Sequence, residues 1–261
     1  MFRQRFLTAL ILVPLVLLAI YYGNIWMLST VVLVLMVTLG WEWLSLIPVS
    51  HLMYQCLFML SLLIFLIPSM YWLHEYLLMS FVVWGLILVA VLTFPKSQRY
   101  WGNRVVVGGA CLFILPTFLS SLDALLQFKQ GRDLLVYLLF LVWATDIGAY
   151  LAGKQWGRHK LIPSVSPGKT WEGASGGFIM AMLVAFGAYF YFHPHDALTW
   201  FAIALFIILI SMLGDLFISM LKRRCKLKDT GQLLPGHGGV LDRLDSLIAA
   251  LPFFCFFCKV F

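Results

Sequence analysis

Long apolar segments recur along this chain and restrict what it can fold into. A helix of about 20 apolar residues is long enough to cross the hydrocarbon core of a bilayer. By that criterion the sequence predicts about nine spans. They are Phe6 to Tyr22, Ile25 to Leu44, Tyr54 to Leu73, Tyr76 to Phe94, Val105 to Leu126, Leu134 to Leu151, Gly173 to Phe192, Leu198 to Phe217 and Leu241 to Phe261. Because charged residues make up 11% of the chain, against about a quarter of a soluble domain, we expect an all-α, polytopic integral membrane protein.

The basic residues predict the orientation of these spans. With the N-terminus in the cytoplasm, all but three of the 18 Lys and Arg residues fall on the cytoplasmic side, the exceptions being Lys129, Arg132 and Lys259. Arg3 and Arg5 precede the first span as in a signal peptide, but no small-residue cleavage site follows, so we expect a retained helix. The net charge of +7 lies at membrane boundaries, where anionic lipid rather than nucleic acid is the expected partner.

Charged residues divide the chain into two parts. Residues 1–132 contain few charges within their spans and are expected to be a lipid-facing scaffold, whereas residues 133–261 are expected to be catalytic. This second part carries Asp146, Asp215, Asp242 and Asp245 in or at the ends of apolar segments. A single such aspartate could equally well serve only to pair with a nearby lysine as take part in a site. Four of them beside basic loops favour a single polar cavity that faces the cytoplasm.

The end of the eighth predicted span has the residue types of a polyphosphate site. Helical spacing puts Asp215, Ser219 and Lys222 on one face. Further on, Asp242 and Asp245 share a face in the first turn of the last helix, whose free N-terminal amides suit an anion. Carboxylate oxygens favour Mg²⁺ over zinc, so we expect magnesium.

The segment Gly168-Lys169-Thr170 invites comparison with a phosphate-binding P-loop. Pro163 stands where a P-loop requires glycine, and no buried parallel strand is expected before it, so we reject that interpretation. What remains is a basic, hydroxyl-bearing turn that suits either a substrate phosphate or a lipid headgroup.

Residues 219–245 form a longer pattern. It reads Ser219-x2-Lys222-Arg223-x4-Lys228-Asp229-x-Gly231-x3-Pro235-x-His237-Gly238-Gly239-x2-Asp242-Arg243-x-Asp245. This pattern resembles the signature of the phosphatidate cytidylyltransferase (CDP-diacylglycerol synthase) family, without a departure. The upstream run Ser166-Pro167-x-Lys169-Thr170-x-Glu172-Gly173 is similar to a second motif of that family.

The resemblance implies a reaction and a location. The phosphate of phosphatidic acid would attack the α-phosphorus of CTP, giving CDP-diacylglycerol and pyrophosphate for phospholipid biosynthesis. The enzyme would lie in the bacterial inner membrane with its site facing the cytoplasm. Its partners would be CTP, phosphatidic acid and membrane lipids, and by analogy a second copy of the chain.

The resemblance also implies roles for individual residues. Asp215 and Asp242 would be the principal Mg²⁺ ligands, with Asp146 and Asp245 as further candidates, and a second metal or a monovalent cation is left open. The catalytic set would be Asp215, Ser219, Lys222, Arg223, Asp242 and Asp245. The substrate phosphates would be bound by Ser166, Lys169, Thr170, Lys228, Asp229, His237, Gly238, Gly239 and Arg243.

Other classes of protein share parts of this pattern. A CTP-using polyprenol kinase or an ether-lipid cytidylyltransferase would need similar groups. An ion-coupled transporter also places aspartates within the membrane, but here they cluster beside loops and no internal repeat relates the two halves. A CDP-alcohol phosphotransferase is disfavoured because its D-G-x2-A-R run is missing.

Overall fold

Helices make up most of the described part of the protein. The computed structural model describes residues 13–47, 49, 51–233 and 238–258. After a first helix over Val13–Tyr22, the elements are α2 (Ile25–Leu46), α3 (Leu52–Tyr71), α4 (Leu73–Thr93), α5 (Gln98–Trp101), α6 (Arg104–Leu126), α7 (Gly131–Trp156), β1 (Lys160–Ile162), β2 (Ser166–Thr170), α8 (Trp171–Phe192), α9 (Ala197–Arg224) and α10 (Leu241–Phe257).

The all-α class is confirmed, and the helices fit a membrane protein by their length and apolar composition. In the described chain, α2, α3, α4, α6, α7, α8 and α9 are the seven helices that are long and apolar enough to cross a membrane. The α10 helix has 17 residues and falls just short of that length. Seven of the predicted spans therefore meet the criterion, while parts of the first and the last predicted spans lie outside the described residues.

Polar side chains and loop residues set where several helices begin. The side chains of Asn24, Asn103 and Thr170 accept a backbone N–H in the first turns of α2, α6 and α8. Asp196 does the same for α9, accepting from the amides of Leu198 and Thr199. Hydrogen bonding from the Thr199 side chain, then from its amide, lowers the pKa of the Asp196 carboxyl. These caps satisfy donors that a helix start otherwise leaves free.

Two features differ from the prediction. Strands β1 and β2 form an antiparallel hairpin between α7 and α8, which the sequence did not predict because Pro163 and Pro167 argue against strands. The Gly168-Lys169-Thr170 segment lies on β2, so its backbone does not form a P-loop. Helix α9 continues to Arg224 rather than ending at Phe217, and its basic last turn is favourable at a helix C-terminus.

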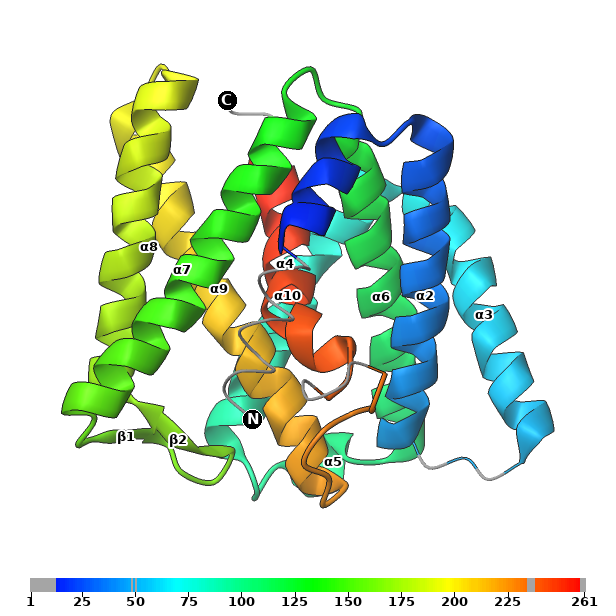
Figure 1. Cartoon of the computed structure of the whole chain (residues 1–261). Coiled ribbons are helices and arrows are strands. Elements are labelled where there is room, and N and C mark those ends of the chain that lie inside the picture. Colours follow the sequence, from blue (N-terminus) through cyan, green and yellow to red (C-terminus); the bar gives the residue numbers. More distant parts are fainter. Residues whose placement is uncertain (1–12, 48, 50, 234–237, 259–261) are drawn as a thin grey trace.

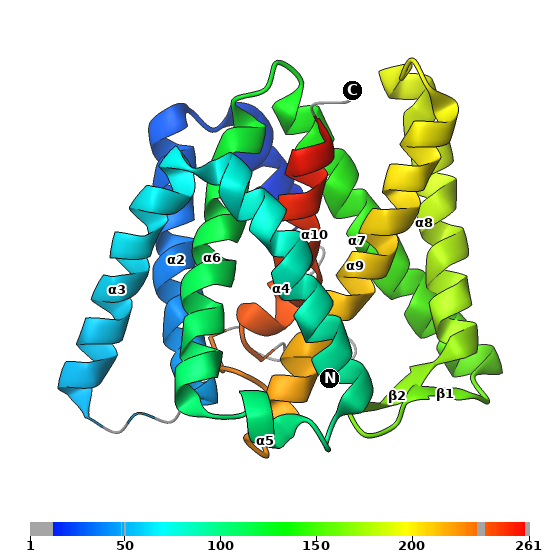
Figure 2. The same ribbon diagram turned by 180° about the vertical axis from the view of Figure 1, so that it is seen from behind.

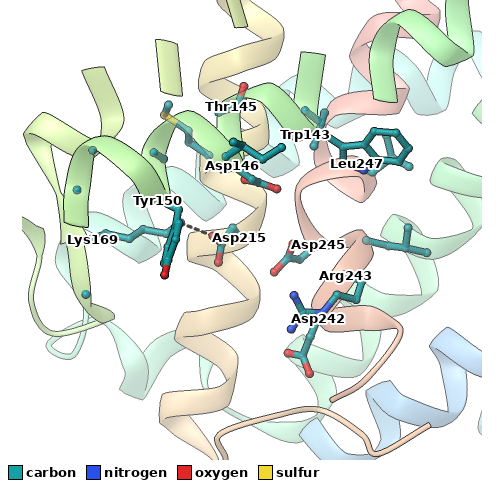
Figure 3. A pocket seen from close by; sticks show the side chains of 18 of the residues that line it. Trp143, Thr145, Asp146, Tyr150, Lys169, Asp215, Asp242, Arg243, Asp245 and Leu247 are labelled. Carbon is teal, nitrogen blue, oxygen red and sulfur yellow. Dashed lines mark ion pairs between the residues drawn. The ribbon is translucent and has the colours of Figure 1, made fainter. Parts of the chain in front are cut away.

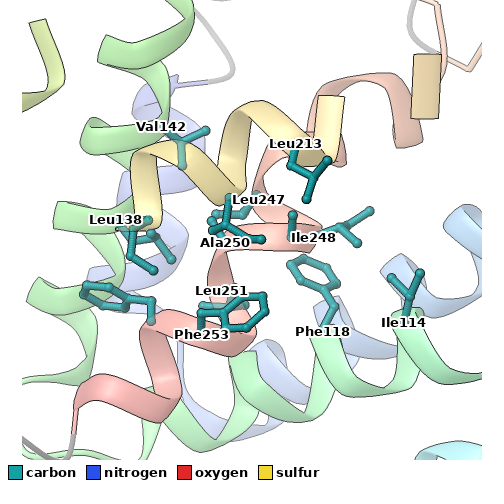
Figure 4. Close-up of a cluster of buried hydrophobic side chains, with 14 of the residues drawn as sticks. Ile114, Phe118, Leu138, Val142, Leu213, Leu247, Ile248, Ala250, Leu251 and Phe253 are labelled. Carbon is teal, nitrogen blue, oxygen red and sulfur yellow. The ribbon is translucent and has the colours of Figure 1, made fainter. Parts of the chain in front are cut away.

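Helix α10 lies at the centre of the bundle, between α4, α6, α7 and α9 (Figures 1 and 2). Most of its aliphatic residues, such as Leu251, are buried, and they meet Phe118 of α6 and Leu213 of α9 in one apolar cluster (Figure 4). A Cβ atom at Gly214 would lie 2.4 Å from the carbonyl oxygen of Asp245. Glycine at this position therefore lets α9 approach α10 and brings Asp215 beside Asp245.

Helices α7 and α8 pack through small residues, which gives a prediction for stability. A Cβ atom at Gly176 of α8 would lie 2.2 Å from the Cβ of Ala152 on α7. We expect Gly176→Ala to lower the apparent melting temperature, because overpacking of this kind costs about 1–3 kcal/mol. Gly187→Ala on the same helix is the matched control, since nothing lies within 4 Å of its added carbon. Equal melting temperatures for the two variants would contradict this packing.

Candidate functional site

The predicted aspartates come together in one cavity. Its volume is about 860 Å³, and its walls come from the first helix, α7, β1, β2, α8, α9, α10 and the loop after α9. Asp146, Asp215, Asp242 and Asp245 all line it, and Figure 3 shows their side chains around a common space. The wall also contains apolar residues such as Val142 and Trp143. The cavity thus offers both charged and hydrocarbon surfaces.

Asp215 is held from two sides. Lys169 of β2 places its Nζ atom 2.6 Å from Oδ2 of Asp215, and the Ser219 hydroxyl donates to Oδ1 over 3.2 Å. Asp215 and Ser219 therefore share a face of α9, as the sequence predicted. The hairpin supplies the cation, so β2 and α9 together form this part of the cavity.

Asp242 is the most fully bonded of the four carboxylates. Its Oδ1 lies 2.6 Å from Nζ of Lys222. Its Oδ2 accepts from Thr230 N at 2.8 Å, Thr230 Oγ1 at 3.0 Å and Gly239 N at 3.2 Å. The Asp242 side chain is 3% exposed, and a buried charge needs such partners. Asp242 therefore ties α9 and the following loop to the start of α10.

The other three carboxylates have fewer hydrogen-bond partners among the described residues. Asp245 accepts from the Ser246 amide at 2.7 Å, and in Figure 3 it lies across the cavity from Asp215 and below Asp146. Three carboxyl groups around one space offer oxygen ligands of the kind that Mg²⁺ prefers. Among the described residues, no three His, Cys, Asp or Glu side chains are placed to hold a metal ion by themselves. Mg²⁺ commonly takes one or two carboxylates and completes its shell with water and substrate phosphates, so the donor set fits a magnesium ion shared with a phosphate ligand.

The remaining predicted residues divide into two groups. Those that line the cavity are Lys169, Thr170, Lys222, Asp229 and Arg243. Those that are described but not part of its lining are Ser166, Ser219, Arg223, Lys228, Gly238 and Gly239. His237 lies outside the described residues.

Several of these residues make structural contacts. The Arg223 Nε donates to the Val165 carbonyl over 3.2 Å and so ties the hairpin to α9. Thr170 caps α8 through the Gly173 amide. Gly238 has a φ of 83°, a conformation that favours glycine.

The start of α10 differs from the expectation that its free amides face a substrate anion. The amides of Val240 and Leu241 donate to the carboxylate of Glu42 on α2 instead. Sequence reasoning assigned Glu42 to the scaffold, although a carboxylate within an apolar span was a signal that could have found it. A protein carboxylate therefore occupies the anion position at this helix start.

The fold is that of a helical protein with seven helices long and apolar enough to cross a membrane in its described part, and its cavity combines charged and apolar surfaces. The chain belongs to the cytidylyltransferase family, whose model matches residues 3–261. It is 38% identical over 265 residues to a protein named phosphatidate cytidylyltransferase from Pseudomonas aeruginosa, a match that covers 97% of this chain and 96% of the relative.

Two further relatives carry the same name. The protein from Haemophilus influenzae is 43% identical over 189 residues, which cover 67% of this chain and 65% of the relative. The protein from Bacillus subtilis is 33% identical over 208 residues, which cover 78% of this chain and 77% of the relative. The similarity is thus found in relatives from different bacteria.

Proposed function

We propose that this chain is a phosphatidate cytidylyltransferase, which transfers CMP from CTP to phosphatidic acid and releases pyrophosphate. The observation that supports this most is the cavity, in which the pairs Lys169–Asp215 and Lys222–Asp242 stand beside an apolar wall. The relatives named above, one matched over nearly the whole chain, carry this name. The product, CDP-diacylglycerol, serves phospholipid biosynthesis.

The reaction joins two anions, and this decides what the cavity has to supply. A non-bridging oxygen of the phosphatidic acid phosphate attacks the α-phosphorus of CTP. The bond from that phosphorus to the oxygen bridging to the β-phosphate breaks, and pyrophosphate leaves with the bonding electrons. Lys169, Lys222 and Arg243 bring positive charge to the cavity, where it offsets the repulsion between the substrates. Such positioning and charge neutralisation need no covalent enzyme intermediate.

Magnesium is the proposed cofactor. Asp215, with Asp146 or Asp245 as a further ligand, would hold the ion in the cavity, and water and substrate phosphates would complete its shell. When bound, Mg²⁺ neutralises the charge of the polyphosphate. Asp242 stays a predicted ligand, but its Oδ1 could bind an ion only if Lys222, whose Nζ lies 2.6 Å away, moved aside.

The charge distribution supports a cytoplasmic site. Helix α5, the hairpin and the C-terminal end of α9 lie at one end of the bundle, opposite the loop between α6 and α7 (Figures 1 and 2). That end carries the basic residues that the positive-inside rule places in the cytoplasm, where CTP is available. We therefore propose a bacterial inner-membrane enzyme with its N-terminus and its site on the cytoplasmic side. The homodimer stays a prediction.

Lys169 offers a prediction with a close control. We expect Lys169→Met to lower kcat/KM by about 100-fold, because one cation that offsets phosphate charge is lost and Asp215 loses its partner. Lys160→Met is the control, since Lys160 lies on the other strand of the hairpin, is exposed and is not part of the cavity lining. The measurement is the initial rate of lipid product formation by each variant and by the wild type. Equal losses in the two variants would remove Lys169 from the proposed site.

The proposed function is tested by product formation. The purified protein in detergent is given CTP, phosphatidic acid and Mg²⁺, and the lipid product and pyrophosphate are quantified by mass spectrometry and an enzymatic assay. We expect CDP-diacylglycerol and pyrophosphate in equal amounts, and no product when Mg²⁺ is removed by a chelator. Polyprenol and an ether-lipid phosphate are offered as competing acceptors. Preference for either would contradict the assignment of phosphatidic acid as substrate.

A further inference from the structure

Glu42 is a buried carboxylate on α2, 3% exposed, that binds the start of α10. Its Oε1 accepts from Val240 N at 2.9 Å, and its Oε2 accepts from Leu241 N at 2.7 Å. Val240, the residue before α10, makes no side-chain cap hydrogen bond of its own. A carboxylate from 198 residues away in the sequence thus caps the helix and is stabilised by its dipole.

The loop that leads to α10 is shaped around this carboxylate. A Cβ atom at Gly231 would lie 2.5 Å from Glu42 Oε1, and one at Gly239 would lie 2.5 Å from Oε2. Ser45, one turn further along α2, donates to the Thr230 carbonyl over 2.9 Å. Two glycines of the family signature therefore make room for Glu42.

A short series of contacts connects Glu42 to the cavity. Thr230 Oγ1 lies 3.3 Å from Glu42 Oε2 and 3.0 Å from Asp242 Oδ2. Thr230 N and Gly239 N, which flank Glu42, also donate to Asp242. Asp242 in turn holds Nζ of Lys222. Displacing Glu42 would therefore move the groups that fix Asp242 and Lys222.

We propose that Glu42 is a positioning residue that sets the Asp242–Lys222 pair for binding the phosphates of CTP. This inference rests on the proposed function. Glu42 would act on the substrate indirectly, through Thr230, Gly239 and Asp242, and not by contact. A carboxylate that stabilised only the fold would change the amount of active protein and leave the binding of CTP as it is.

The test compares Glu42→Gln with Glu75→Gln, the same change at an exposed glutamate on α4. Both Glu42 oxygens accept from backbone amides, those of Val240 and Leu241. In Glu42→Gln an NH₂ group replaces one of these oxygens, so one backbone N–H would face another donor. We expect kcat to fall about tenfold or more and KM for CTP to rise about fivefold. KM for phosphatidic acid should stay within about twofold of wild type, and Glu75→Gln should match wild type throughout.

Thr230→Val provides a second variant, which keeps the shape of the side chain and removes the hydroxyl between the two carboxylates. Like Glu42→Gln, it should raise KM for CTP. If Glu42→Gln does not fold, Thr230→Val provides the test. Equilibrium dialysis with CTP and Mg²⁺ separates this inference from the proposed function. If the wild-type protein binds CTP but makes no lipid product, the proposed reaction is contradicted. Weaker CTP binding by Glu42→Gln would then still support the inference. Unchanged KM and affinity for CTP in both variants overturn the inference.

Discussion

An Asp215→Asn variant is expected to lose CDP-diacylglycerol synthesis by about 100- to 1000-fold. Asp215 faces the cavity, lies 2.6 Å from Nζ of Lys169 and accepts from Ser219. The amide removes the charge that holds Lys169 and an anionic oxygen proposed to bind Mg²⁺. Because asparagine has nearly the same shape, the packing of α9 against α10 at Gly214 should be kept. Steady-state rates with saturating CTP and phosphatidic acid measure the loss.

Asp123→Asn is the control for this variant. Asp123 lies on α6, accepts a hydrogen bond from Gln127 and is not part of the cavity lining. It undergoes the same chemical change, and we expect wild-type rates. An Asp215→Asn protein that elutes as wild type does and retains more than about a tenth of the activity would exclude Asp215 from the reaction.

The Lys222–Asp242 pair is expected to show the second large effect, on stability as well as on activity. Removing one partner of a buried ion pair typically costs about 3–5 kcal/mol. In Lys222→Met the Asp242 carboxylate keeps three donors from Thr230 and Gly239. In Asp242→Asn the new amide group must face one of those donors or Lys222. We therefore expect both variants to lose activity by about 100-fold or more, and Asp242→Asn to unfold at the lower temperature.

Thermal unfolding in detergent and product assays distinguish these outcomes. Lys226→Met is the matched control, because Lys226 follows α9 and is exposed. The double variant Lys222→Met with Asp242→Asn should be less destabilised than the sum of the single variants, since the two residues interact directly. Additive losses, or single variants as stable as wild type, would show that the pair does not hold the loop.

The sequence predicted the membrane helices well because hydropathy is a local property. Most spans begin or end within a few residues of the helices observed, and aspartates within apolar segments correctly indicated a cavity. The hairpin was missed because its strands are short, β2 contains Pro167, and Pro163 directly follows β1. Glu42 was missed because its partners lie 188 to 199 residues further along the chain, and no local pattern reports such a contact.

Asp242 and Asp245 show the limit of arguments from helical spacing. Residues three apart lie about 60° apart around a helix, which allows both to line one cavity. At the start of α10 this angle is enough for them to bind different partners, Asp242 the loop and Lys222, and Asp245 the Ser246 amide. The sequence therefore indicated the shared site but not which of the two carboxylates has open oxygens.

The position of the transferred phosphorus tests the central claim most directly. The purified protein is incubated with phosphatidic acid, Mg²⁺ and CTP that carries radioactive phosphorus in either the α- or the γ-phosphate, and the lipid is extracted and counted. Cytidylyl transfer predicts that the α-label enters the lipid and that the γ-label is released in pyrophosphate. A γ-label in the lipid would identify a CTP-dependent kinase, and folded protein that puts neither label into lipid would contradict the proposed function.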